Sequence, residues 1–413
     1  MTEILVMCLF FLLSLFLLRR EGLLEEPILL FTAAAALTLA FSLRWCMLDY
    51  ETLDYQDFLA RWVDFYRHNG GFRGLKTPVG NYNVPYLYFL ALFSRTEYPD
   101  LYLIKYLSIA FDVLLAWSGM KLVSLVTEKP GARLGAFLGI LLLPTVLLNG
   151  ALWGQCDSIY TALALCAIWC GLSHRPRLSL VLATLSFAFK LQAVFLLPLF
   201  FVLLTTGRIK WKQLWIVPFT YVASILPAVA AGRPFFDTLT LYLHQTGSIG
   251  SGLNYNSSSL YAFYRGGGDE AALARLGIIG AILFCVLLLG ALTVLRRRCS
   301  EKVMLCAFAL CAVCLPLLLP HMHDRYFFGA DVLSFLLIFL SPALLPVPFL
   351  CSFASLLGYH AYLKMRYLLP MRCGATALLF AAAMMLAALV LELRAAPVQT
   401  EEKEKLPNPE NLC

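Results

Sequence analysis

Residues 303–326 read VMLCAFALCAVCLPLLLPHMHDRY, an apolar run that ends directly in a cluster of two histidines, an aspartate and an arginine. A membrane helix needs about 20 mostly apolar residues, because the hydrocarbon core is about 30 Å thick. Charged and imidazole side chains at the edge of such a span are costly unless they serve a function. The stretch therefore predicts a membrane helix with a functional site at its end.

The rest of the chain has the same character. Of its 413 residues, 61% are hydrophobic and only 14% are charged, whereas soluble domains have about 25% charged residues. We expect an all-α, polytopic transmembrane helical bundle of about eleven to thirteen spans, surrounded by membrane lipid. The net charge of +7 comes from small Lys and Arg clusters between apolar runs, as topology control requires, so nucleic acid is not an expected partner.

The cysteines give no sign of a metal or redox centre. Cys311 and Cys314 have a CxxC spacing, but they lie inside an apolar run and have no second pair. A free cysteine in such a run behaves as a small hydrophobic residue. We therefore expect no metal and no other cofactor.

The basic clusters also predict the sidedness of the chain. Arg19-Arg20 and Arg296-Arg297-Arg298 favour the cytoplasm. This places two long polar loops, about residues 49–99 and 232–270, on the outside. The first of these loops has a short apolar segment that predicts an interfacial helix. We expect one transmembrane domain over residues 1–394, whose first span is retained rather than cleaved, and a solvated or disordered tail over residues 395–413.

The apolar stretch Leu178 to Thr206 is long for one span and short for two, and Lys190-Leu191-Gln192 interrupts it. Because basic residues flank it on both sides, it must leave the cytoplasm and return, with broken helices that turn near Lys190. The topology then places Asp54, Asp157, Lys190 and Arg325 on one side of the membrane.

These residue types suggest an acid–base reaction on a phosphorylated substrate. A carboxylate at an interface can deprotonate an acceptor hydroxyl in a sugar transfer. Asp54 and Asp57 share a face if the segment is helical, and either can be the base. Lys190 and Arg325 can bind a phosphate group. The alternatives are that the acids are solvated loop residues and that Arg325 is an interfacial anchor.

Several blocks of sequence together resemble a known family. The blocks are Asp54-Tyr55, Gly70-Gly71-Phe72, GNYNVPYLY at 80–88, WGQCDS at 153–158, KLQ at 190–192 and HMHDRYFF at 321–328. They are similar, in order and spacing, to bacterial integral-membrane mannosyltransferases related to the second mannosyltransferase of GPI-anchor synthesis. Those enzymes belong to the GT-C glycosyltransferase superfamily.

The resemblance implies an inverting transfer of a sugar, typically mannose, from a polyprenyl-phosphate carrier to a glycan, lipid or protein acceptor. The transfer would occur at the non-cytoplasmic face of a membrane, which we expect to be a bacterial plasma membrane, and such enzymes commonly need no metal. Asp54 matches the acidic residue that would act as base or orient the acceptor. Asp157 matches a second acidic position, a catalytic residue that would position acceptor or sugar hydroxyls. Four matching positions would hold the lipid phosphate: Lys190, Gln192, His323 and Arg325. Further residues of the matching blocks would bind substrate: His321, Asp324, Tyr326, Gln155, Asn83 and Tyr86.

The chain departs from the family pattern at two places. Asp324 stands where glutamate is usual, which conserves the charge. Thr52-Leu53 stands where Ser-Gly is expected before Asp54, and this keeps Asp57 as the alternative base.

A transporter or flippase of lipid-linked sugars is the main alternative function, because broken helices and intramembrane charges also mark transport sites. A transporter would place its charges near mid-membrane in two related halves. Here the charges gather at one interface, and the sequence has no internal repeat. A non-enzymatic assembly subunit is a third alternative, in which the acids could vary without loss of function.

Overall fold

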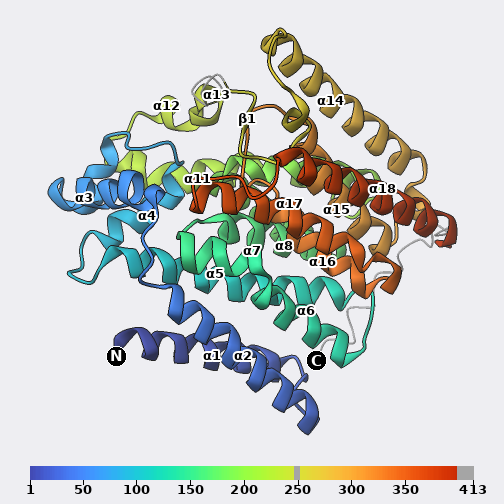
Figure 1. Cartoon of the computed structure of the whole chain (residues 1–413), viewed down its shortest axis with the longest axis horizontal. Coiled ribbons are helices and arrows are strands. Elements are labelled where there is room, and N and C mark those ends of the chain that lie inside the picture. The colour runs from blue at the N-terminus through green and yellow to red at the C-terminus, as the bar shows by residue number, and fades with distance from the viewer. Residues whose placement is uncertain (246–251, 398–413) are drawn as a thin grey trace.

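The structure is a computed structural model that describes residues 1–245 and 252–397 (Figure 1). In this part of the chain, eight helices are long and apolar enough to span a membrane. Residues 130–142 and 144–153 form a pair bent by 45° that would make a ninth. Three shorter apolar helices, residues 157–172, 176–189 and 328–339, correspond to segments that the sequence predicts as spans. The prediction of an all-α polytopic bundle is confirmed.

The helices and strands follow one another along the chain with short connections, apart from the two long polar loops. Their bounds are α1 Thr2–Arg20, α2 Pro27–Met47, α3 Ala60–His68, α4 Val84–Phe93, α5 Asp100–Val123, α6 Pro130–Leu142, α7 Pro144–Leu147, α8 Asp157–Leu172, α9 Pro176–Phe189, α10 Phe200–Thr205, α11 Ile216–Ala230, α12 Phe235–Leu239, α13 Leu241–Gln245, β1 Asn254–Tyr255, α14 Glu270–Val294, α15 Glu301–Leu318, β2 Met322–His323, α16 Phe328–Leu336, α17 Pro346–Leu363 and α18 Met371–Ala395.

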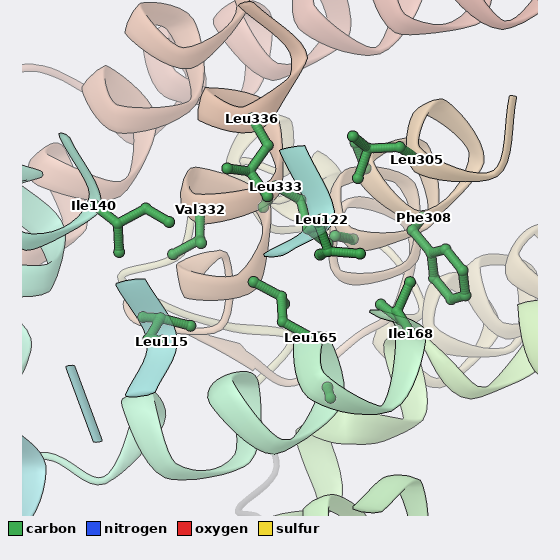
Figure 2. Close-up of a cluster of buried hydrophobic side chains, with 14 of the residues drawn as sticks. Leu115, Leu122, Ile140, Leu165, Ile168, Leu305, Phe308, Val332, Leu333 and Leu336 are labelled. Carbon is green, nitrogen blue, oxygen red and sulfur yellow. The ribbon is translucent and has the colours of Figure 1, made fainter. Parts of the chain in front are cut away.

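The core lies where α5, α6, α8, α15 and α16 meet (Figure 2). Helices α8 and α15 are apolar on almost every face, and most of their residues are buried. A helix that is hydrophobic all round must lie inside the bundle or face lipid. In Figure 1, α1 and α2 lie along one side of this core and α14 lies on the opposite side.

The chain breaks at Lys190, as the sequence predicts. Helix α9 ends at Phe189, and Lys190 has an extended backbone with φ −153° and ψ 133°. Short 3₁₀ turns and α10 then lead the chain back. Irregular backbone at membrane depth is tolerated where it lines a cavity, and Lys190 does line one, as described below.

The two ends of the bundle differ in their charges. At the end opposite to Lys190, Glu21 forms ion pairs with Lys121 at 2.9 Å and Arg133 at 3.2 Å. Near them in the fold, Arg208 pairs with Glu301 at 2.7 Å.

Helices α2, α9 and α15 end, and α8 begins, at the Lys190 end. The residues that follow or start those helices therefore come together there.

A short parallel pairing orders the loop after α15. Asn254 pairs with Met322, and Tyr255 pairs with His323. The Nδ1 atom of His321 lies 2.7 Å from the carbonyl oxygen of Gly252. These contacts fix the segment that the sequence singles out.

A buried ion pair joins four helices beneath this end of the bundle. The Nε and Nη2 atoms of Arg44 in α2 donate to Oδ2 of Asp112 in α5, at 3.2 and 2.9 Å. Arg44 also donates to the carbonyl oxygen of Leu141 in α6, and the Ser158 hydroxyl in α8 donates to Oδ1 of Asp112. Both charged side chains are fully buried. No sequence motif marks either residue, because the pair joins segments far apart in the chain.

Replacement of Asp112 by alanine is expected to destabilise the protein by about 3–5 kcal/mol, because it leaves the Arg44 guanidinium buried without its partner. The measurement is equilibrium unfolding in mixed micelles. The double variant Arg44→Met/Asp112→Leu removes both charges, and we expect it to recover most of the loss. Equal stability of the wild type and Asp112→Ala would contradict a stabilising role for the pair.

Candidate active site

A cavity of about 530 Å³ opens at the Lys190 end of the bundle. Four segments that are distant in the sequence supply its polar lining. Asp54 follows α2, Gln155 precedes α8, Lys190 follows α9, and Asp324 and Arg325 follow α15. The cavity thus joins the acidic and cationic groups that the topology places on one side.

Of the two acids that line this cavity among the described residues, Asp54 is the more exposed. Its Oδ2 accepts hydrogen bonds from Nε1 of Trp153 at 2.9 Å and from Nε2 of Gln155 at 2.8 Å. The Tyr362 hydroxyl accepts from the backbone N–H of Asp54 at 2.8 Å. Thr52 fixes the backbone just before Asp54, because its hydroxyl donates to the carbonyl oxygen of Trp153. The carboxylate is therefore held in one orientation.

Trp153 forms the support behind Asp54. Its ring stacks on Tyr362 with centroids 4.2 Å apart and meets the edge of Tyr359 at 5.3 Å. It is fully buried and ends a π-helical turn, Leu148–Trp153, a feature often found at functional sites. Trp153 lies within the WGQCDS motif, but the motif alone indicates no role for it. The contacts with α17 could not be predicted from that motif.

The cations of the cavity are arranged around Asp157. Lys190 Nζ lies 2.5 Å from Oδ1 of Asp157, and Arg325 Nε lies 3.9 Å from Oδ2. Asn149 donates to the same Oδ2 at 2.8 Å. Asp157 is fully buried and is absent from the cavity lining among the described residues. It therefore holds the two cations in position from behind.

Arg325 lies between three carboxylates. Its Nη1 is 3.6 Å from Asp54 and 3.6 Å from Asp324, in addition to the contact with Asp157. Its plane also faces the Trp153 ring at 5.5 Å. Among the described residues, the buried Nε has no hydrogen-bond partner. These separations are longer than ordinary charged hydrogen bonds, so the guanidinium retains capacity for an anionic ligand.

Two titratable groups beside Arg325 have shifted pKa values. Burial raises the pKa of Asp324 from 3.8 to about 7, against the opposing effect of Arg325. Burial, together with the charges of Arg325 and Lys190, lowers the pKa of His323 to about 4. His323 is therefore neutral near pH 7, and its ring stacks on Tyr255 with centroids 4.7 Å apart. The positive charge of the cavity comes from Lys190 and Arg325.

The other residues predicted to bind substrate divide into two groups. Gln155, Gln192, Tyr326 and Asn83 line the cavity. Asn83 also caps α4 through the Val84 N–H.

Tyr86 and His321 are absent from the described lining. Tyr86 is buried against Tyr82, with ring centroids 4.9 Å apart. His321 contacts the backbone of the loop before β1. The structure places both residues in supporting positions.

Asp57 lies away from the cavity. Its side chain is 53% exposed and pairs with Arg61 at 3.0 Å on the outer face of the chain. Asp54 and Asp57 do not share a face toward the site, because the chain between Tyr55 and Leu59 forms a π-helical turn. Of the two carboxylates, only Asp54 lines the described cavity.

In the described part of the chain, no group of three or more His, Cys, Asp or Glu side chains has the geometry of a metal site. The polar side chains that line the cavity are instead two carboxyl groups, Asp54 and Asp324, two cations, one imidazole and several amide or phenol groups. This combination can bind a phosphate and, at the same time, accept a proton.

Comparison with known proteins identifies the family. Residues 81–320, more than half of the chain, match the family model of glycosyltransferase family 87. No curated protein matches the chain. The matched range includes Gln155, Asp157 and Lys190. Asp54 lies before it, and the residues around Arg325 directly follow it. The chain belongs to glycosyltransferase family 87 and is a multi-pass membrane glycosyltransferase.

Proposed function

We propose that this enzyme transfers a sugar, with mannose the first candidate, from a polyprenyl-phosphate carrier to an acceptor hydroxyl, with inversion at the anomeric carbon. The observation that supports this most strongly is the cavity in which Asp54 faces Arg325 and Lys190. The mannose and the polyprenyl carrier follow from the resemblance of the sequence blocks to membrane mannosyltransferases.

Lys190 and Arg325 would bind the phosphate of the donor. Arginine offers a planar fork of donors that fits phosphate, and lysine offers a point charge. Asp157 is suited to keep both cations aimed at one place, because it contacts Lys190 at 2.5 Å and Arg325 at 3.9 Å. Bound phosphate would replace the long contacts of Arg325 with the carboxylates by shorter charged hydrogen bonds.

Asp54 would act as the general base. The acceptor oxygen gives its proton to the Asp54 carboxylate and forms a bond to the anomeric carbon of the donor sugar. The bond between that carbon and the phosphate oxygen breaks, and the electron pair leaves with the lipid phosphate, which Lys190 and Arg325 stabilise. Attack from the face opposite to the phosphate inverts the anomeric centre.

The distribution of charge supports a reaction at the non-cytoplasmic face. Basic residues gather at the end of the bundle opposite to the cavity, among them Lys121, Arg133 and Arg208. Loops rich in Lys and Arg remain in the cytoplasm. The cavity would then open toward the outside of the membrane that holds the enzyme, which we propose is a bacterial plasma membrane.

The test is transfer of radiolabelled mannose from polyprenyl-phosphate-mannose by the purified protein in membranes that contain host lipid extract. Label that moves into a new product only with active protein would establish the reaction, and isolation of the product would identify a glycan, lipid or protein acceptor. Lack of transfer from mannose, glucose and galactose carriers, with labelled lipid that changes leaflet, would contradict the proposal and indicate a transporter.

The pKa of Asp324 predicts a pH dependence of donor binding. Below about pH 7 its carboxyl is protonated, and above that pH it places a negative charge 3.6 Å from Arg325. A phosphodiester donor stays ionised throughout, and His323, with a pKa of about 4, does not titrate in this range. We expect the KM for the donor to rise about three- to tenfold between about pH 6 and pH 8.

The variant Asp324→Asn should remove this dependence and leave a low donor KM at both pH values. The same ionisation affects stability. Because the pKa in the folded state exceeds that of an unfolded aspartate, the folded protein binds the proton more tightly, and stability falls as pH rises from about 4 to 7. If the donor KM of Asp324→Asn still rose with pH as in the wild type, Asp324 would be excluded as the cause of that rise.

A further inference from the structure

A second groove, of about 570 Å³, lies beside the active-site cavity. It is formed by the segment from β1 to Tyr264 and by the connection between α17 and α18. The side chains that give it its character are Tyr261, Tyr264, Tyr367 and Asn254. Neither the motifs of the sequence nor the proposed chemistry of the first cavity assigns a role to this groove.

Asn256 joins the two spaces, because it lines both of them. Its Oδ1 accepts a hydrogen bond from the Tyr367 hydroxyl at 2.6 Å, and its backbone forms a bridge with His323. Its φ of 54° is left-handed, a conformation that asparagine adopts more readily than most residues. A Cβ on Gly358 would lie only 2.8 Å from the Asn256 carbonyl oxygen. The shared wall is therefore closely packed and fixed in place.

The two spaces differ in charge. The first cavity is lined by Asp54, Lys190, Asp324 and Arg325, whereas no charged side chain lines the second groove among the described residues. Amide and phenol groups can hydrogen-bond to sugar hydroxyls, and the ring of a tyrosine offers an apolar face to the C–H groups of a sugar. This chemistry suits a neutral saccharide rather than a phosphate.

The groove also has an apolar border. Leu368 is 65% exposed and Leu369 is 42% exposed, and both line the groove just before α18 begins. Exposed leucines beside a sugar-binding surface suit a ligand with a hydrocarbon chain next to its head group. A lipid-linked glycan has both parts.

We propose that this groove binds the neutral glycan head group of a lipid-linked acceptor, whose terminal hydroxyl passes Asn256 to reach Asp54. The role as acceptor rests on the proposed transfer reaction, but the binding of a neutral alkyl glycoside does not. The division of charge then has a direct meaning: the donor phosphate occupies the first cavity, and the uncharged acceptor occupies the second.

The test measures binding of hexyl glycosides to the full-length protein in lipid nanodiscs by saturation-transfer NMR, with the mannoside, glucoside and galactoside as probes. In Tyr264→Ala and in Tyr367→Ala, we expect the Kd of the best-bound probe to rise about tenfold, a loss of about 1.4 kcal/mol. Tyr367 is 61% exposed, so we expect its replacement to preserve the overall fold, although it also removes the hydrogen bond to Asn256. The matched control is Tyr50→Ala, an exposed tyrosine outside both linings, which should bind as the wild type does.

Each outcome decides one part of the proposal. Binding that is unaffected by both groove variants, or absent for all three glycosides, would overturn the groove as a glycan site. Equal affinity for methyl and hexyl glycosides would overturn the lipid-linked acceptor and indicate a soluble glycan. Groove-dependent binding without sugar transfer from any carrier would contradict the proposed reaction and leave the binding site in place.

Discussion

Replacement of Asp54 by asparagine is expected to lower the rate of sugar transfer about 10²- to 10⁴-fold, the usual contribution of a general base. Asparagine has the same shape and can still accept hydrogen bonds from Trp153 and Gln155, which now hold Oδ2 at 2.9 and 2.8 Å. It cannot take the proton of the acceptor hydroxyl. The measurement is the single-turnover rate with labelled polyprenyl-phosphate-mannose.

Donor binding separates loss of the base from loss of the fold. Lys190 and Arg325, not Asp54, would bind the donor phosphate, so Asp54→Asn should bind the labelled carrier about as tightly as the wild type. Binding could be slightly tighter, because the substitution removes one negative charge near Arg325. Transfer at more than a tenth of the wild-type rate would exclude Asp54 as the base.

Asp57→Asn is the matched control. It is the same substitution three residues away, on an exposed carboxylate that pairs only with Arg61 among the described residues. Exposed ion pairs contribute little, so we expect activity within about twofold of wild type. If Asp57→Asn lost transfer and Asp54→Asn kept it, the roles of the two acids would be reversed.

The sequence predicts the general architecture and the grouping of the charges because both follow from strong physical constraints. Apolar length identifies spans, and basic clusters fix the sides of the loops. These rules alone place four residues on one side of the membrane: Asp54, Asp157, Lys190 and Arg325. In the structure, Arg325 contacts both aspartates, and Lys190 contacts Asp157. The turn at Lys190 follows from the same reasoning.

Side-chain direction could not be predicted in this way. An i, i+3 spacing places Asp54 and Asp57 on one face only if the segment is a regular α-helix, and the π-helical turn changes that relation. The resemblance implies that Asp157 positions acceptor or sugar hydroxyls, yet its side chain is fully buried and contacts Lys190 and Arg325 instead. The supporting pair of Arg44 and Asp112 depends on helix packing between distant segments, which leaves no local pattern.

Arg325→Ala is expected to raise the Kd for the labelled polyprenyl-phosphate-mannose about 10- to 100-fold, because charged hydrogen bonds contribute about 1.5–3 kcal/mol. The Nε of Arg325 has no partner among the described residues, and its contacts with Asp54 and Asp324 are both 3.6 Å long. A guanidinium so placed can gain more from a phosphate than Lys190, which is already engaged with Asp157 at 2.5 Å.

The same substitution also removes the cation from three carboxylates, so Arg325→Ala should be less thermally stable than the wild type, with a lower Tm. The double variant Arg325→Ala/Asp324→Asn separates the effect on stability from the effect on donor binding. Asp54 and Asp324 both lie 3.6 Å from Arg325, and the double variant removes the charge of Asp324, the more deeply buried of the two. We expect the double variant to recover part of the loss in Tm, while its affinity for the donor stays as low as that of Arg325→Ala. If donor affinity returned together with the Tm, Arg325 would act by balancing the acids, and the phosphate would have to be held by Lys190 alone.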